Sequence, residues 1–147
     1  MSILSYKTGR LKMIKDNVAD FYCLAAKFTN KTGEASVRGK IVSISEGYAD
    51  SVELTASSGV YHFYPVGIIY SDSVSDGLDI WVAIQGEMKV MVVDNEFCTQ
   101  SDAAVVGTTD GKASCATPSN NPQTIGIFLQ NYTIPPHSNA LVPIYKR

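Results

Sequence analysis

The feature that most constrains the fold is the apolar run DIWVAIQGEMKVMVV at residues 79–93. Every residue of 80–84 is apolar, and 88–93 is interrupted only by Lys89. The intervening Gln-Gly-Glu, residues 85–87, predicts a short turn, so the run is interpreted as a β-hairpin. A strand with one solvated face alternates apolar and polar residues. These two arms do not alternate, so we expect both faces of the hairpin to be covered.

Strand signals also dominate the rest of the chain. Turn signals such as Asp-Gly recur between short apolar segments at intervals of about 8–12 residues, which is typical of a β-sandwich or barrel. Residues 17–28 are ambiguous between a short helix and an irregular strand. We predict an all-β fold, a small β-barrel or β-sandwich with an extended N-terminal arm. Further strands are predicted at 37–45, 51–56, 60–70 and 124–130, and residues 105–116 carry an Asp110-Gly111 hairpin signal.

Charge is distributed unevenly along the 147 residues. Residues 1–40 hold eight Lys or Arg against three acids, whereas residues 41–110 hold eleven acids and one base. We predict a basic arm over residues 1–16 and a single β-rich domain over 17–147 with a proline-rich tail. The arm has few strand signals, so we expect it to become ordered on an acidic protein partner; a solvated terminus is the alternative. An acidic body disfavours direct nucleic-acid binding, which depends on neutralising phosphates.

Few residues suggest catalysis. His62 and His137 have no second histidine at metal-ligand spacing. No GxSxG, GxxxxGK[ST] or GxGxxG pattern occurs. Asp72, Asp76 and Asp79 fit no EF-hand loop and are interpreted as solvated turn acids. We therefore expect no enzyme activity, no cofactor and no metal.

Aromatic residues gather at Tyr61, Phe63 and Tyr64. Platforms that stack nucleic-acid bases combine aromatic residues with Lys or Arg, which this run lacks. Core packing is therefore the preferred interpretation of the run.

The cysteines indicate a reducing compartment. Cys23, Cys98 and Cys115 are odd in number, widely spaced and without CxxC or Cys/His ligand spacing, so we expect reduced, partly buried thiols. The first residues lack a signal-peptide core, and no segment approaches the ~20 apolar residues of a membrane span. Synthesis in a cytoplasm and no membrane contact are expected.

Two stretches carry a family resemblance: PVGIIYSDSVSDGLDIWVAIQGEMKV at 65–90 and VVGTTDGKASCATPSNNPQTIGIFLQ at 105–130. Their order is an aliphatic-Gly-Ile strand, an acidic turn with Asp-Gly, a Val-rich strand ending in Gly, a further hairpin and a closing Ile-Gly-Ile strand. This order resembles the head decoration, or capsid-stabilising, proteins of tailed bacteriophages. The resemblance spans roughly residues 37–130 and leaves out the arm and the tail.

The resemblance implies a structural virion protein on the capsid exterior. It implies binding to the major capsid protein of an assembled shell, stabilisation against internal DNA pressure, and a homotrimer made in the host cytoplasm. One hairpin face would then pack on the subunit's own core and the other on a neighbouring subunit. The alternative is that one subunit covers both faces. Candidate interface residues are Leu4, Tyr6, Lys7, Arg10, Leu11, Lys12, Trp81, Met88, Met91 and Val93.

Side-chain alternation makes the hairpin hypothesis specific. Met88, Val90 and Val92 share one strand face, and Met91 and Val93 share the other. If the first set is core and the second a subunit contact, Val92→Asp should unfold the chain. Met91→Asp should instead give a folded protein that fails to assemble.

Two other functions remain open from the sequence. A carbohydrate- or receptor-binding virion module would use exposed aromatic residues, with Trp81 and Tyr61 as candidates, although we expect Trp81 to be buried in so apolar a strand. A trimeric β-fold nucleotide hydrolase of the dUTPase kind would need Asp- and Gly-containing substrate motifs, which we do not find.

Overall fold

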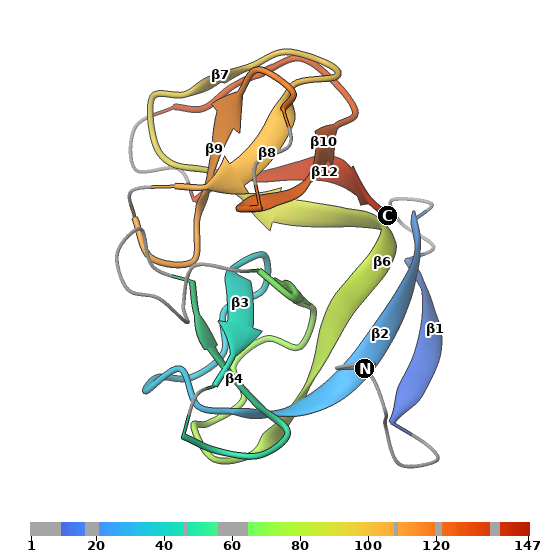
Figure 1. Cartoon of the computed structure of the whole chain (residues 1–147), viewed down its shortest axis with the longest axis vertical. Helices are drawn as coiled ribbons and strands as arrows, with labels where there is room; N and C mark the ends of the chain where they lie inside the picture. The colour runs from blue at the N-terminus through green and yellow to red at the C-terminus, as the bar shows by residue number, and fades with distance from the viewer. Residues whose placement is uncertain are drawn as a thin grey trace.

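The structure is a computed structural model that describes residues 10–16, 21–45, 47–55, 65–107, 109–119, 122–135 and 139–147. These residues form strands, turns and loops and contain no helix, so the predicted all-β, barrel- or sandwich-like fold is confirmed (Figure 1). No helix in the described ranges could cross a membrane.

Ten strands form one mixed sheet in the order β1-β2-β4-β3-β5-β6-β12-β10-β8-β9, and two short strands form a second. The ambiguous segment 17–28 contains the first part of a strand, not a helix. The strands are β1 (Leu11–Asp16), β2 (Phe21–Asn30), β3 (Ile41–Ile44), β4 (Ser51–Leu54), β5 (Gly67–Ile69), β6 (Asp79–Met91), β7 (Phe97–Cys98), β8 (Ala103–Val106), β9 (Ala113–Ala116), β10 (Thr124–Phe128), β11 (Tyr132–Thr133) and β12 (Leu141–Lys146).

Five strands form a partly closed ring. β2 pairs antiparallel with β6 and, through Thr29 and Asn30, parallel with β4; β3 and β5 complete the circuit β2-β4-β3-β5-β6. The ring encloses branched and aromatic side chains, because alternate residues of each strand point inward. Its core consists of Ala26, Phe28, Val42, Val52, Val66, Ile69, Ile80, Val82 and Ile84.

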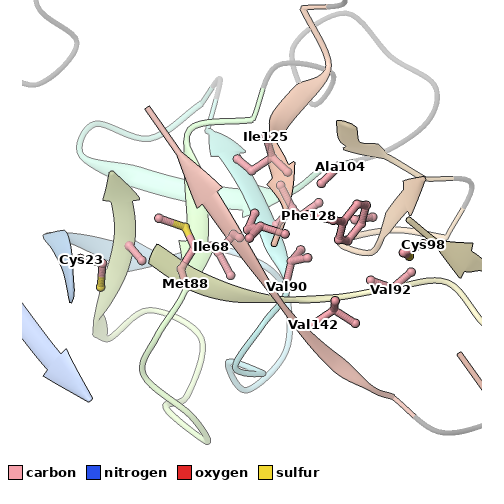
Figure 2. Packing of buried hydrophobic residues seen from close by; sticks show 14 of the residues in the cluster. Cys23, Ile68, Met88, Val90, Val92, Cys98, Ala104, Ile125, Phe128 and Val142 are labelled. Atoms are coloured by element: carbon pink, nitrogen blue, oxygen red, sulfur yellow. The ribbon is translucent and has the colours of Figure 1, made fainter. Parts of the chain in front are cut away.

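A second core lies between the outside of the ring and a second layer of strands. The last part of β6 continues into this layer and pairs with β12; β12 pairs with β10, β10 with β8, and β8 with β9. Figure 2 shows Met88 near Cys23 at one end of this core and Phe128 near Cys98 at the other. Its other buried residues include Ile41, Ile68, Val90, Val92, Ala104, Ala113, Ile125, Val142 and Ile144.

The predicted hairpin is wrong, because residues 79–91 form one continuous strand. Gly86 is not in a turn: it pairs with Cys23 on one side and with Lys146 on the other. Its φ of 103° is one that glycine adopts readily, and a Cβ there would lie 2.5 Å from the carbonyl oxygen of Tyr22. Glycine therefore permits close strand contact where the sequence suggested a reversal.

A bulge beside Gly86 changes which face of β6 meets which core. Residues 83 and 85 pair with Ala25 and Leu24, so Ile84 is an extra residue on the β6 side. Up to the bulge, the even-numbered residues Ile80, Val82 and Ile84 point into the ring. Beyond it, the even-numbered residues Met88, Val90 and Val92 point into the second core. One subunit thus covers both faces of the strand, which was the alternative to a subunit contact.

The second half of the predicted N-terminal arm, residues 1–16, is a strand of the large sheet. Residues 11–16 form β1 and pair residue by residue with β2, and Ile14 is buried in the second core. The sequence Leu-Lys-Met-Ile-Lys has too few residues for alternation alone to identify a strand, so the pairing depends on β2. Residues 1–9 lie outside the described residues.

The prediction of three reduced thiols is wrong for two of them. Cys98 of β7 and Cys115 of β9 form a disulfide, with their Cα atoms 5.5 Å apart and 17 residues of sequence separation. Cys23 is buried and takes no part in this disulfide. Spacing of this length carries no local signal; the pairing arises because the two strands meet at the same end of the second core.

Candidate functional site: the exposed edge strand

The structure brings together only part of the predicted interface. Arg10, Leu11 and Lys12 lie at or beside the start of β1, and Lys12 contacts Trp81. Met88 and Met91 are 4% and 5% exposed, so neither can form a subunit contact as the protein stands. Val93 is half-buried. The remaining candidates, Leu4, Tyr6 and Lys7, lie outside the described residues.

β1 is the edge strand of the large sheet, and Figure 1 shows it at the margin of the molecule beside β2. The backbone N–H of Lys27 donates to the carbonyl of Arg10, at 2.9 Å. Hydrogen-bonded pairs alternate along an antiparallel ladder, so Lys12 and Ile14 also bond to β2. The N–H and C=O groups of residues 11, 13 and 15 therefore point to the free edge.

One face of β1 is apolar and solvent-exposed. Leu11 is 45% and Met13 64% exposed, and they stand opposite Ala26 and Leu24 of β2. Tyr22, 52% exposed, extends this face along β2. The sequence reasoning missed Met13 and Tyr22. Alternation of Leu11 and Met13 with Lys12 was the available signal, but the adjacent Ile14 obscured it.

The opposite face of β1 is basic and aromatic. The Nζ of Lys12 lies 4.1 Å from the centroid of the Trp81 ring, and that of Lys27 lies 5.2 Å from it. Trp81 is partly buried against the second core, less deeply than the sequence suggested. Two lysines already stack on this ring, so Trp81 is a poor platform for a sugar. Tyr61, the other candidate for carbohydrate binding, lies outside the described residues.

Positive charge accumulates around this edge. Arg10, Lys12 and Lys15 lie on or beside β1, and Lys27 lies on β2, against one acid of the strand, Asp16. Lys15 also lies over the ring of Tyr22, with Nζ 5.2 Å from its centroid. We call Arg10–Lys15 with Tyr22, Lys27 and Trp81 the β1 surface. It combines exposed apolar area, free backbone groups and net positive charge.

The cavities give little support for a small-molecule site. A cavity of about 30 Å³ lies beside Ile14, Cys23 and Met88. It can hold one or two waters but is far below the ~300 Å³ at which ligand pockets begin. Two open depressions of about 280 Å³ each flank the C-terminal Lys146-Arg147. Burial lowers the pKa of Lys146 there by desolvating its ammonium group.

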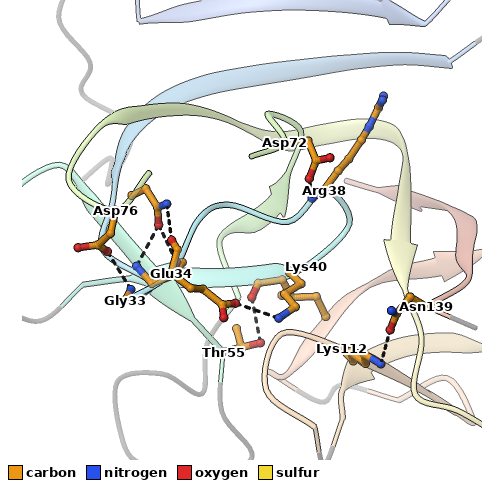
Figure 3. Close-up of polar contacts among 12 residues, drawn as sticks. Gly33, Glu34, Arg38, Lys40, Thr55, Asp72, Asp76, Lys112 and Asn139 are labelled. Atoms are coloured by element: carbon orange, nitrogen blue, oxygen red, sulfur yellow. Dashed lines mark hydrogen bonds and ion pairs between the residues drawn. The ribbon is translucent and has the colours of Figure 1, made fainter. Parts of the chain in front are cut away.

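The turn acids connect two loops in the structure. Asp76 accepts a hydrogen bond from the backbone N–H of Gly33 at 2.8 Å, and Asp72 accepts one from that of Arg38 at 3.1 Å (Figure 3). Asp79 accepts from the hydroxyl of Thr29. Their partners differ, and the parts of the chain that are described contain no group of three or more potential metal ligands.

The histidines and the aromatic run Tyr61, Phe63 and Tyr64 lie outside the described residues, so the structure bears on neither. Comparison with known proteins gives no identification: no family model matches the chain, and no curated protein matches it significantly.

Proposed function

We propose that this protein is a structural virion component that binds the outer surface of an assembled phage capsid through the β1 surface and stabilises the shell. The observation that carries the docking proposal is the edge strand itself. An edge strand is normally protected by charge, shortness or a cover, because its free backbone groups and apolar residues favour association. Here Leu11 and Met13 stay exposed on that edge.

Charge supports a protein partner with acidic character. The acids of the chain concentrate in residues 41–110, whereas the bases concentrate in residues 1–40 and around β1. A molecule with this asymmetry would approach an acidic shell with β1 first, because complementary fields orient an encounter. The acidic body would then point away from the shell.

We include a homotrimer in the proposal, but with contacts other than the predicted Met88 and Met91. Met88 and Met91 are buried within one subunit. Ile127 of β10 and Tyr145 of β12 pair directly and are both exposed, so this pair is the better candidate for contact between copies.

Capsid binding tests the function. Purified capsids lacking this protein would be mixed with the parent and with Lys12→Glu/Lys15→Glu, and the occupancy measured by co-sedimentation. The double variant should lose occupancy, and parent binding should weaken with salt, because exposed charges are screened over about 8–10 Å at physiological ionic strength.

Lys112→Glu is the matched control. Lys112 lies directly before β9, outside the β1 surface, and its Nζ donates a hydrogen bond to the Oδ1 of Asn139. It should bind capsids like the parent. If the parent itself fails to bind capsids, the capsid function is wrong. If the double variant binds normally, the β1 surface is not the docking site.

A further inference from the structure

We propose that the free edge of β1 accepts an extended acidic segment of a partner protein as an added antiparallel or parallel strand. This inference rests on the proposed function only in placing the partner on a capsid. The chemistry of the edge is independent of where the partner resides.

The backbone of β1 is ready for strand addition. Leu11, Met13 and Lys15 direct their N–H and C=O groups away from β2, as the hydrogen bond between Lys27 and Arg10 requires. Within the described ranges no strand pairs with that edge. An added strand forms main-chain hydrogen bonds to such groups, and pockets or charges for its alternate side chains provide specificity.

The two faces of β1 define the sequence pattern of the partner. Successive side chains of an added strand point to opposite faces. On one face they would lie beside Lys12, which favours an acidic residue; Lys27 of β2 lies one strand further from the added strand, and Ile14 of the same face is buried. On the other face they would meet exposed Leu11 and Met13, which favour apolar residues, and then Lys15, which favours an acidic one. The matching segment therefore alternates acidic and apolar residues beside residues 11–14 and carries an additional acid beside Lys15.

Two other occupants fit the edge less well than an acidic strand. A second copy pairing β1 with β1 would bring two sets of Arg10, Lys12 and Lys15 close together without adding as many acids, and this net positive charge repels the second copy. A nucleic acid would neutralise the lysines but provides no strand backbone for the outward groups of Leu11 and Met13.

The direct test uses a short peptide of alternating Glu and Val and the full-length, isotope-labelled protein without capsids. Binding would be followed by backbone amide chemical shifts and titration calorimetry. Shifts should concentrate at residues 11, 13 and 15. A peptide of alternating Lys and Val should bind at least about tenfold more weakly, because it places cations against cations.

A backbone-methylated Glu-Val peptide separates strand addition from charge attraction. Methylation of the amides that face β1 removes their donors but keeps charge and apolar side chains. We expect at least about a tenfold loss of affinity. Equal binding of the methylated and unmethylated peptides would show charge attraction only and would overturn the proposal.

Variants of Met13 test the same point from the protein side. Proline is tolerated on an edge strand where its missing N–H faces solvent, so Met13→Pro should fold while losing a donor at the edge. Met13→Ala keeps the donor and removes only the side chain. Peptide binding should fall further for Met13→Pro than for Met13→Ala, with folding checked by circular dichroism. Equal binding by both variants would contradict strand addition, and the methylated peptide decides the matter if Met13→Pro does not fold.

Two further outcomes distinguish this inference from the capsid function. Analytical ultracentrifugation that shows a dimer lost in Met13→Pro but kept in Met13→Ala would assign the edge to a second copy and overturn the acidic partner. Peptide binding by a protein that does not bind capsids would retain strand addition and reject the capsid function. Capsid binding by a protein that does not bind the Glu-Val peptide would retain the capsid function and reject strand addition.

Discussion

The ring and the second layer share β6 but are stabilised differently. Apart from Ala26, the ring core consists of larger residues, with Phe28, Ile69 and Ile80 among its buried members, on strands that return to one another. The second core includes small residues such as Ala104 and Ala113 and has a disulfide at its far end. Larger side chains bury more apolar area per residue, so the ring depends on packing and the second layer depends partly on a covalent link.

The bulge of β6 explains how one strand supports both regions. Figure 1 shows β6 following the ring and then turning sharply into the second layer. One extra residue reverses the inward face, so neighbouring halves of a single strand contribute to two cores. The two apolar parts of residues 80–93 thus mark a strand that is covered on both faces inside one subunit.

The largest expected effect tests whether one subunit covers both faces. Val92→Asp and Met91→Asp should each cost more than about 4 kcal/mol, because each buries an unpaired charge. This differs from the expectation from sequence that Met91→Asp would stay folded. Gln85→Asp, at an exposed position of the same strand, is the control. Denaturant unfolding followed by circular dichroism measures all three; a folded Met91→Asp protein with near-parent stability would restore the subunit contact.

Gly86 tests whether the two regions are joined by a continuous strand. Gly86→Ala should cost about 1–3 kcal/mol for the strained φ, and more because its Cβ meets the Tyr22 carbonyl. Gly77→Ala is matched, with a φ of 89° and nothing within 4 Å of the added Cβ. Unfolding free energies should rank Gly86→Ala as the more destabilised. Equal losses would argue against close strand packing at Gly86.

The disulfide tests the unequal dependence of the two regions on covalent support. Closing a loop of this length contributes about 3 kcal/mol. Cys98→Ala/Cys115→Ala should therefore speed amide hydrogen exchange in β8 and β9 more than in β2 and β5. Reducing agent should produce the same change in the parent and none in the double variant. An equal increase in the amide exchange rates of both regions would show that they unfold as one unit.

The smallest expected effect concerns Lys146, near the point where the two regions separate. Its pKa is lowered by desolvation, so between the lowered pKa and 10.5 the folded state binds fewer protons than the unfolded state, and stability rises with pH. Lys146→Met should raise Tm slightly at pH 7, and the difference from the parent should shrink as pH approaches 10.5. Thermal melts across this range measure it. A constant difference would assign the effect to packing.

Local patterns of the sequence predicted the all-β class, several of the strands and the acidic loop residues, but not β1 or the continuity of β6. Short apolar segments separated by Asp-Gly turns predict β-structure because alternation and turn geometry are local properties. Asp76 does lie in a turn and Asp72 lies in the loop before it, and both carboxylates accept backbone hydrogen bonds there. Arg10, Leu11 and Lys12 of the predicted interface are exposed or partly exposed at the start of β1, and their role in an interface stays a prediction.

Tertiary structure alone decided whether Gly86 ends a strand or lets another approach, because glycine permits both and only the position of Tyr22 selects one. It also decided the pairing of Cys98 with Cys115, which depends on two strands meeting in space. The position of β1 at the edge of the sheet also depends on tertiary structure. Its residues become an edge strand because β2 provides one hydrogen-bonding partner and the described part of the fold provides no second, a property of sheet order and not of any short segment.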